Sequence, residues 1–269
     1  MEYKVGDIIW RDLKVIDVKG GPGKSGFGIV YVCYSDRWKR MVAVKSFQDQ
    51  YLYRGDKIAD KVVEDFYHEA ETWMKLGWHL HIVNAIQIIF LDYKPHILLE
   101  YIDGGDLKER LEHGPLGIHE ALHFAIQFCD GMIYANSVDL GGGVRGIVHR
   151  DIKPSNIMLK KGVVVALTDF GLVKALGRWR VEGAGTPEYM SPEQFETVDV
   201  DTRSDIYSFG VVMYEMLSGR LPFSPTHIER EKQKTLEEIF NIIDRLGLEP
   251  TIAEKLVSSG YKTLATIAM

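Results

Sequence analysis

Cysteine is scarce in this sequence: only Cys33 and Cys129 occur among its 269 residues. Two cysteines so far apart provide neither a disulfide framework nor a zinc-ligand pattern, so a reducing, cytoplasmic compartment is expected. The sequence also lacks an apolar run approaching the roughly 20 residues of a membrane helix. No secretory apolar region accompanies the polar stretch 1–7. We therefore expect no membrane segment in this chain.

An excess of positive charge is absent as well. The chain carries 32 Lys and Arg against 38 Asp and Glu, which gives a net charge of −6. Such a balance is not typical of proteins that bind nucleic acids or membrane surfaces in bulk. The hydrophobic content of 46% is enough for the core of one or two domains.

Glycines gather in the N-terminal third, between two segments rich in β-branched and aromatic residues. Residues 10–18 and 29–34 are predicted strands, and the cluster 20–28 is the turn between them. Glycine lets backbone N–H groups approach a phosphate closely. The Gly-Lys-Ser at 23–25 is not a Walker A loop, because Val18 stands where that pattern needs a glycine, and a strand follows instead of a helix.

Lys45 ends a predicted strand that begins at Met41, and helical periodicity follows over residues 59–76. Glu69 falls on the apolar face of this helix, whereas Glu71 lies away from it. A carboxylate among apolar neighbours needs a cationic partner. Lys45 is the candidate that we expect to pair with Glu69.

Two further strands, 88–90 and 96–101, precede a glycine pair at 104–105 that marks the best domain boundary in the chain. Asp106 stands where it would cap a helix beginning at Leu107. Residues 139–146 are interpreted as an inserted surface loop. An amphipathic helix is predicted over 118–134, with Ala121, Leu122, Ala125, Ile126, Cys129, Met132 and Ile133 on its apolar stripe.

The most informative pattern runs from His149 to Asn156. Asp151, Lys153 and Asn156 supply an acid, a cation and an amide within one short stretch. An apolar run at 163–167 then carries a second acid, Asp169, to the same place. Phosphoryl transfer needs an acid that accepts a proton, a cation that neutralises phosphate, and oxygen ligands for Mg²⁺. A solvated polar loop would explain any one of these residues, but it explains the ordered set poorly.

The His-Arg-Asp-Ile-Lys-Pro-Ser-Asn stretch and the later Asp-Phe-Gly resemble the catalytic and metal-binding loops of Hanks-type (eukaryotic-type) protein serine/threonine kinases. The resemblance spans about residues 10–223. It implies an α+β, two-lobed kinase fold, with an antiparallel β-sheet N-lobe that carries one key helix, and a mainly helical C-lobe. The implied domains are 1–101 (N-lobe), 102–225 (C-lobe core) and 226–269 (helical tail).

The resemblance also implies an ATP site. Residues 23–30 resemble the kinase glycine-rich loop, with Ser25 where the second glycine is expected, and Lys45 would hold the α- and β-phosphates while pairing with Glu69. Asp106 remains open between accepting from the ribose and capping its helix. The expected ATP-binding residues are Gly23, Lys24, Ser25, Gly26, Phe27 and Gly28 in the loop, Lys45 and Asp169 at the phosphates, Val30, Ala43 and Met158 around the adenine ring, Glu100 and Ile102 through their backbones, Leu99 at the back pocket, and Asp106.

For catalysis, the resemblance implies that Asp151 orients the substrate hydroxyl and accepts its proton. Lys153 would neutralise charge on the transferred γ-phosphoryl, and Asn156 and Asp169 would ligate Mg²⁺. A lysine at 153 resembles serine/threonine kinases and not tyrosine kinases. The predicted catalytic residues are Asp151, Lys153, Asn156, Lys45 and Glu69.

Residues 185–193 resemble a substrate-docking loop, in which Thr186 and Glu188 would contact the substrate side and Thr186 would bond Asp151 and Lys153. His149 and Phe170 are expected to be packing residues. Asp205 resembles the buried anchor of the catalytic loop; alternatively, Ser204 or Asp205 caps the helix that runs to Leu217.

The loop 172–184 contains no Ser, Thr or Tyr. Many kinases order this loop by phosphorylation, which supplies charge for an arginine partner. Arg150 is such a partner here. We hypothesise that Glu182 takes the place of a phosphate beside Arg150, so unphosphorylated protein from bacteria should already be active.

The function predicted from the sequence is transfer of the γ-phosphoryl of ATP, with Mg²⁺, to Ser and Thr hydroxyls of a protein substrate. The alternative is a catalytically weak, pseudokinase-like nucleotide-binding scaffold that recruits partners. A small-molecule phosphotransferase is disfavoured by the docking-loop resemblance at 185–193.

The tail contains a capping box at Thr235, and residues 247–268 weakly resemble half of a helix-hairpin-helix module. We expect the tail to complete the C-lobe, dock a partner or complete a dimer. Nucleic acid is not the expected partner. The apolar end at Met269 suggests a fragment of a longer chain.

Overall fold

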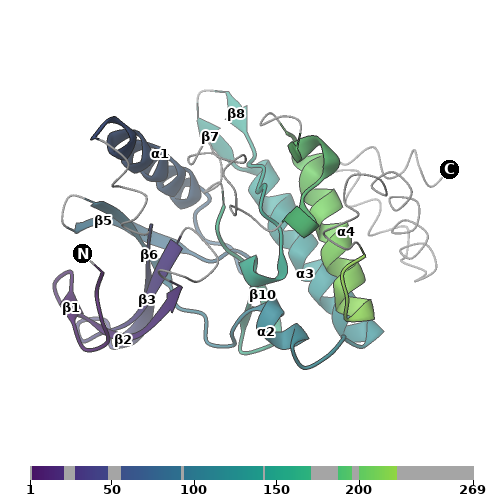
Figure 1. The fold of residues 1–269 in the computed structure, drawn as a ribbon, viewed down its shortest axis with the longest axis horizontal. Helices are drawn as coiled ribbons and strands as arrows, with labels where there is room; N and C mark the ends of the chain where they lie inside the picture. The colour runs from purple at the N-terminus through teal and green to yellow at the C-terminus, as the bar shows by residue number, and fades with distance from the viewer. Residues whose placement is uncertain are drawn as a thin grey trace. The chain divides into compact units, whose positions relative to one another are not determined.

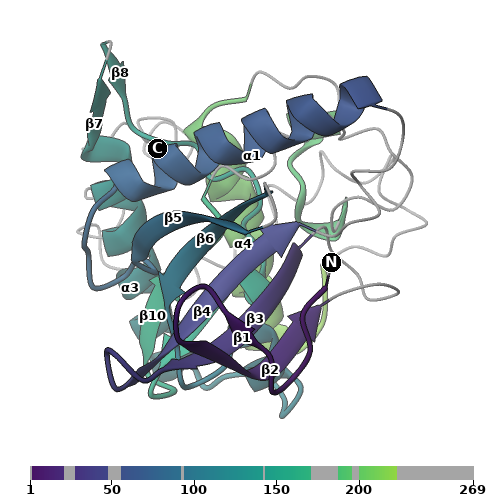
Figure 2. The same cartoon turned by 90° about the vertical axis from the view of Figure 1, so that its left-hand side faces the viewer.

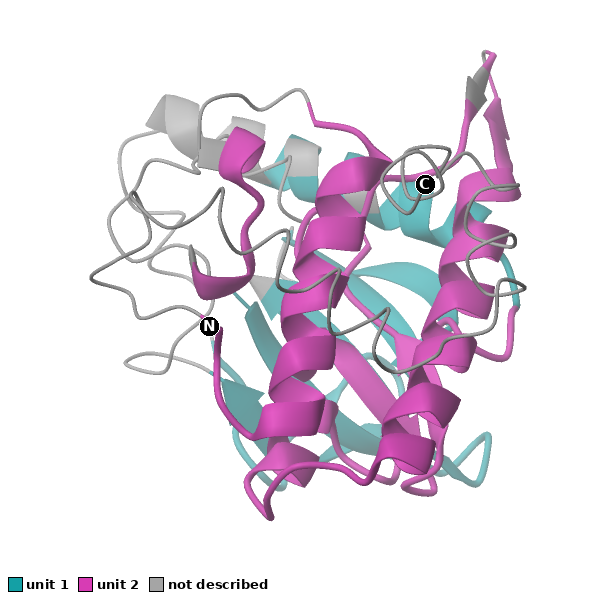
Figure 3. Ribbon diagram, turned by 90° about the vertical axis from the view of Figure 1, so that its right-hand side faces the viewer, with its two compact units in different colours: residues 1–78, 83–102, 171–185 teal, residues 79–82, 103–170, 186–269 magenta. Residues whose placement is uncertain are grey.

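The computed structural model describes residues 2–20, 28–47, 56–91, 94–141, 143–170, 187–195 and 200–222. The predictions for the loop residues 23–27, Thr186, Glu182 and the tail 226–269 fall outside these ranges. The chain divides into two compact units (Figure 3): unit 1 holds residues 1–78, 83–102 and 171–185, and unit 2 holds residues 79–82, 103–170 and 186–269. Within the described ranges, no helix combines the length and apolarity needed to cross a membrane.

Unit 1 is built on a six-stranded sheet in which every neighbouring pair of strands is antiparallel. The strands predicted from β-branched and aromatic residues are all present, whereas the predicted turn at 20–28 lies mostly outside the described residues. Figure 2 shows the sheet, whose order is β1 (Ile8–Ile9), β2 (Leu13–Gly20), β3 (Gly28–Ser35), β4 (Arg40–Phe47), β6 (Lys94–Glu100) and β5 (Ala85–Leu91).

One boundary in this sheet differs from the prediction. The first strand was expected from Trp10, but β2 begins at Leu13. Trp10 and Arg11 have φ angles of 31° and 62°, which are incompatible with an extended strand. They form the turn after β1, so β-branched and aromatic content placed the strand correctly but began it too early.

Helix α1 (Asp56–Lys75) packs against β5 and β6 in unit 1 (Figures 1 and 2). Phe66, Ala70 and Trp73 are buried at helical spacing, which confirms the predicted helix and its apolar face. The indole N–H of Trp73 donates to the carbonyl oxygen of Val83 at 3.0 Å, so this buried ring has its polar group satisfied.

Unit 2 contains the paired helices α3 (Ile118–Ser137) and α4 (Thr202–Ser218), which lie side by side in Figure 3. The rings of Phe128 and Phe209 stack between them, with centroids 3.7 Å apart. The predicted amphipathic helix is therefore confirmed, although Ile126, expected on its buried stripe, is 49% exposed. The remaining elements are α2 (Leu107–Leu111), the hairpin β7 (Asp139–Gly141) and β8 (Val144–Arg145), and the hairpin β9 (Ile157–Lys160) and β10 (Val164–Leu167).

The start of α4 decides what Asp205 can do. The helix begins at Thr202 and is capped by Asp201, whose side chain accepts from the backbone N–H of Arg203 at 2.9 Å. The alternative in which Ser204 or Asp205 caps this helix is therefore wrong. Gly219 ends the helix in the left-handed conformation, with φ of 70°, as is common for a glycine just after a helix.

Candidate active site

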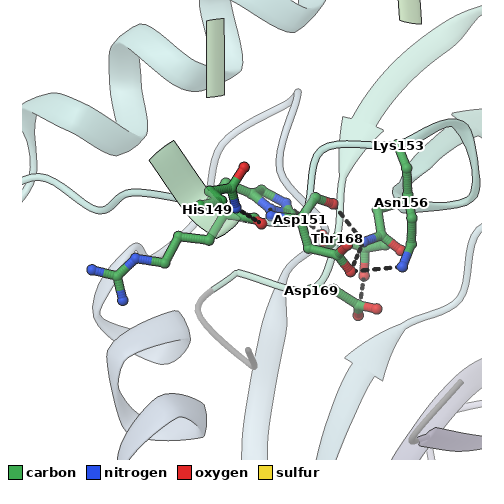
Figure 4. Close-up of polar contacts among 8 residues, drawn as sticks. His149, Asp151, Lys153, Asn156, Thr168 and Asp169 are labelled. Carbon is green, nitrogen blue, oxygen red and sulfur yellow. Dashed lines mark hydrogen bonds and ion pairs between the residues drawn. The ribbon is translucent and has the colours of Figure 1, made fainter. Parts of the chain in front are cut away.

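The residues 147–156 after the β7–β8 hairpin lead through a 3-10 turn, Pro154–Asn156, into β9. Strand β10 pairs with β9 so that Leu167 faces Ile157. Beyond this pair, the backbone N–H of Thr168 donates to the carbonyl oxygen of Asn156 at 3.1 Å. The hairpin therefore holds Asn156 and Asp169 at the same end of the two strands (Figure 4).

The Asp151 carboxylate is held by its neighbours through one oxygen. Its Oδ2 lies 2.8 Å from the Lys153 ammonium and accepts from the Asn156 side-chain amide at 2.8 Å (Figure 4). The same amide nitrogen donates to the backbone oxygen of Asp151 at 2.8 Å. Among the described residues no donor bonds Oδ1, and the Asp151 side chain is 20% exposed. One oxygen is thus fixed and the other can meet a substrate.

His149 is fully buried and has a structural role, as predicted. Its Nε2 bonds the carbonyl oxygen of Thr168 at 2.8 Å, and its Nδ1 accepts from the backbone N–H of Asp151 at 3.4 Å. A carbonyl oxygen can only accept and an N–H can only donate, so the neutral ring with its proton on Nε2 fits both contacts. The Phe170 ring packs 4.7 Å from the imidazole centroid.

Asp205 anchors the loop from α4. Its two carboxylate oxygens accept from the backbone N–H groups of His149 at 2.8 Å and Arg150 at 2.7 Å. Complete burial raises the pKa of Asp205, while the two backbone N–H donors and the charge of Arg150 act in the opposite direction. The predicted anchoring role of Asp205 matches this geometry. The buried Nε of Arg150 finds no acceptor among the described residues.

The contacts that Gln194 and Ser204 make near the catalytic loop were not predicted from the sequence. Gln194 donates from Nε2 to the backbone oxygen of Arg150 at 2.9 Å, and Ser204 donates from Oγ to Glu193 Oε1 at 2.6 Å. No local pattern marks a glutamine or serine as the partner of a residue so distant in the chain.

The predicted substrate-side residue Glu188 lies in the 3-10 turn Pro187–Tyr189. Its Oε2 is buried and has no donor among the residues that the structure describes. The next residue, Tyr189, donates from its hydroxyl to Glu215 Oε2 on α4 at 2.6 Å. Burial raises the pKa of Glu215, and the hydrogen bond from Tyr189 opposes this rise.

The predicted nucleotide-side residues fall into two sets. In unit 1, strand register pairs Val30 with Lys45 and Ala43 with Leu99. Glu69 lies in α1, but its side chain is outside the described part of the structure.

In unit 2, Asp106 forms a reciprocal capping box with Glu109, which confirms the capping interpretation. Asp106 also bridges to Met158 through the backbone. The remaining predicted residues are Gly28 at the start of β3, and Glu100 and Ile102 at and just beyond the end of β6.

Comparisons with known proteins bear on this arrangement. The protein kinase domain family model matches residues 17–266. A probable serine/threonine-protein kinase of Clostridium acetobutylicum is 32% identical over 206 residues, which cover 75% of this chain and 29% of that protein. Serine/threonine-protein kinase A of Synechocystis is 38% identical over 177 residues, covering 61% of this chain and 34% of that protein. The chain thus spans about a third of the length of these relatives.

The fold is also found among solved structures. The kinase domain of Mycobacterium tuberculosis PknI is similar with a TM-score of 0.63 and 23% identity, over 84% of this chain and 80% of that one. A double mutant of the same domain gives a TM-score of 0.66 at 22% identity, over 94% and 93% of the two chains. The matched range contains every predicted motif from the glycine-rich loop to helix α4, in which Asp205 lies. The chain therefore belongs to the Hanks-type family of protein serine/threonine kinases, with the two-lobed protein kinase fold.

Proposed function

We propose that this chain transfers the γ-phosphoryl group of ATP to Ser and Thr hydroxyls of protein substrates. The observation that supports the proposal most directly is how the Asp151 carboxylate is held. Lys153 and Asn156 hold one of its carboxylate oxygens at 2.8 Å each, and the other oxygen has no donor among the described residues. A base positioned in this way can accept the hydroxyl proton as the oxygen attacks phosphorus.

Lys153 has a second role in this proposal. The Lys153 side chain is only 19% exposed and its ammonium group lies beside Asp151, so its charge is close to the point where the substrate hydroxyl would meet the phosphoryl group. A preorganised cation there stabilises the negative charge on the transferred group.

Asn156 and Asp169 fit the ligation of Mg²⁺. They supply an amide oxygen and a carboxylate at the same end of the β9–β10 hairpin. The Asn156 Nδ2 is committed to Asp151, so its Oδ1 is the atom left for a ligand role. Within the described residues, no group of three or more His, Cys, Asp or Glu side chains could hold a metal by itself. Mg²⁺ commonly takes one or two protein ligands and completes its shell with water and substrate phosphates.

The nucleotide side of the proposal rests on unit 1. Lys45 would bind the α- and β-phosphates and pair with Glu69. Gly28 allows the glycine-rich loop to begin close to Lys45, because a Cβ at Gly28 would lie 3.1 Å from the Lys45 side chain. In unit 1, Val30 and Ala43 would contact the adenine ring, Glu100 and Ile102 would bind it through their backbones, and Leu99 would stand at the back pocket. In unit 2, Met158 and Asp106 are the proposed ATP-binding residues. We propose the lobes as residues 1–101 and 102–225.

The protein substrate would dock along the segment that contains Thr186 and Glu188. The buried Glu188 Oε2 without a donor in the described part of the chain supports a role in binding a cationic or hydrogen-bond-donating group. We place the reaction in the cytoplasm, where ATP is available and where two buried thiols, Cys33 and Cys129, remain reduced. The tail 226–269 would complete the C-lobe, dock a partner or form part of a dimer interface.

The test compares the protein with Asp151→Asn, using labelled ATP, Mg²⁺ and a generic basic protein substrate. Asn keeps the shape and one acceptor oxygen but cannot accept the proton. We expect incorporation on Ser and Thr to fall by about 10²–10⁴-fold. Asp130→Asn, an exposed carboxylate on α3, is the matched control and should retain activity. Equal incorporation by the parent and Asp151→Asn would overturn the proposal. ATP binding without transfer by either protein would favour the scaffold alternative.

A further inference from the structure

Gln194 lies in the 3-10 turn Pro192–Phe195 (η4), and only 4% of it is exposed. Its Oε1 accepts from the backbone N–H and the hydroxyl of Ser191, at 2.9 and 3.2 Å, and its Nε2 donates to the backbone oxygen of Arg150 at 2.9 Å. The orientation of this amide follows from its partners. An N–H can only donate and a carbonyl can only accept, so Oε1 must face Ser191 and Nε2 must face Arg150.

The residue that Gln194 holds has an unusual backbone. Arg150 has a φ of 67°, in the left-handed region that residues other than glycine rarely adopt. Such a conformation persists where the surroundings fix it, and it is concentrated at functional sites. Two side chains fix it here: Asp205 accepts from the Arg150 N–H at 2.7 Å, and Gln194 donates to the Arg150 carbonyl.

The hold on this carbonyl extends directly to Asp151. The carbonyl of Arg150 and the N–H of Asp151 belong to one peptide unit, which is planar and rigid. Fixing the carbonyl therefore fixes the direction of the Asp151 N–H, which points to His149 Nδ1 at 3.4 Å. It also fixes the backbone from which the Asp151 carboxylate projects. Without Gln194, the Arg150 backbone would keep, among the described residues, the side-chain contact from Asp205 on its N–H side.

We propose that Gln194 is a positioning residue for the Asp151 base, acting through the Arg150–Asp151 peptide. This inference rests on the proposed kinase function. Among the described residues, Gln194 makes no hydrogen bond to Asp151 or to a group assigned to ATP, so its removal should lower kcat and leave the KM for ATP unchanged. A purely structural glutamine would alter stability without this split.

The chain offers a matched structural glutamine in Gln127 on α3. It is also buried, and its amide also bridges an N–H and a carbonyl: Oε1 accepts from Val165 at 2.9 Å and Nε2 donates to Val163 at 3.2 Å. Gln127 makes no hydrogen bond with the catalytic loop in the described structure. The same substitution at 127 and 194 therefore separates the loss of a buried amide from the loss of the Arg150 contact.

The decisive variant is Gln194→Glu. When ionised, the introduced carboxylate places an oxygen against the Arg150 carbonyl oxygen and repels it. Because Asp151 shares this peptide unit, it shifts as well, and a shift of a fraction of an ångström should lower kcat by about 10- to 100-fold. Burial raises the pKa of such a carboxyl, and its protonated form regains an O–H that can donate to Arg150. The ratio of variant kcat to parent kcat should therefore rise as pH falls from about 8 to about 5.5. The neighbouring groups His149, Arg150, Asp205 and Glu193 are present in both proteins, so the ratio removes their contributions.

Three results would overturn the inference in a parent protein that is active: a flat ratio across pH, an equal rise for Gln127→Glu, or a change in the KM for ATP in place of kcat. If Gln194→Glu does not fold, Gln194→Met replaces it, since Met has a similar shape and no donor. Its kcat should fall by a similar factor without pH dependence, and an unchanged kcat would overturn the inference. An inactive parent would instead refute the proposed kinase function.

Discussion

One carboxylate oxygen of Asp205 accepts the backbone N–H of Arg150 at 2.7 Å, across 55 residues of sequence. The other oxygen accepts from His149. Asp205→Asn leaves one acceptor and turns an amide N–H₂ toward a backbone N–H. The variant should therefore lose about 1–3 kcal/mol of unfolding free energy, measured by urea denaturation, and its kcat should fall.

Asp201→Asn is the control for this change. Asp201 caps the same helix from an exposed position, and Asn caps as well as Asp. The control should remain within about 0.5 kcal/mol of the parent. Equal stability of the two variants would contradict the anchoring role of Asp205.

Glu215 should make the free energy of unfolding depend on pH. Burial raises the pKa of its carboxyl above 4.5, against an opposing hydrogen bond from Tyr189. The folded state then binds this proton more tightly than the unfolded chain does, so the contribution of Glu215 to stability declines as pH rises from 4.5 through the folded pKa. Glu215→Gln removes the titration and keeps an acceptor for Tyr189. The unfolding free energy of the variant minus that of the parent should increase with pH and then level off. If the difference between the two unfolding free energies, measured by urea denaturation, stays constant or decreases with pH, the raised pKa of Glu215 is excluded.

Gly104 should not tolerate a side chain. A Cβ there would overlap the Leu159 carbonyl oxygen and the Gly162 amide nitrogen, both of which are backbone atoms that cannot rotate away. Gly104→Ala should cost about 1–3 kcal/mol or more in unfolding free energy. At Gly117, where a Cβ meets no described atom within 4 Å, the same change should cost less than about 1 kcal/mol. Similar losses at both sites in urea denaturation would show that packing around Gly104 is not the cause.

Asp169 is expected to set the metal requirement. Asp169→Asn preserves the shape and the acceptor for the Thr168 hydroxyl, which lies 3.3 Å away, but it removes the negative charge. Hard cations bind carboxylates more strongly than amides. The Mg²⁺ concentration for half-maximal kinase activity should therefore rise, and kcat should fall. An unchanged Mg²⁺ titration curve would remove Asp169 from the metal site.

Local patterns made most of the architecture predictable. Strands β2 to β6 follow from β-branched and aromatic content, and helices α1 and α3 follow from side-chain periodicity; both signals depend only on neighbours in the chain. The placement of Asp151, Lys153 and Asn156 follows from their short spacing, because a tight loop and a 3-10 turn keep them together. The cap at Asp106 was one of two open interpretations, and the capping box with Glu109 confirms it.

The errors and omissions have a common physical cause. Gln194 and Ser204 acquire their roles from partners on other elements, and single-sequence patterns do not specify which distant carbonyl or carboxylate a polar side chain meets. Trp10 and Arg11 have the composition of a strand, but the short connection between β1 and β2 forces them into left-handed conformations. Ile126 has helical spacing that fits the stripe of α3, yet it lies at the exposed margin.

The β9–β10 hairpin has a consequence for the order of folding. Asn156 contacts Asp151 from five residues away, and His149 meets Thr168 from 19 residues away, whereas Gln194 and Asp205 reach the loop across 44 to 56 residues. Contacts of short sequence separation cost less loop-closure entropy and form faster. In pulse-labelled hydrogen exchange, the amides of β9 and β10 should gain protection before those of His149 and Arg150. The acid, cation and amide would then assemble early, and the capacity for phosphoryl transfer would be among the last properties that the refolding chain acquires.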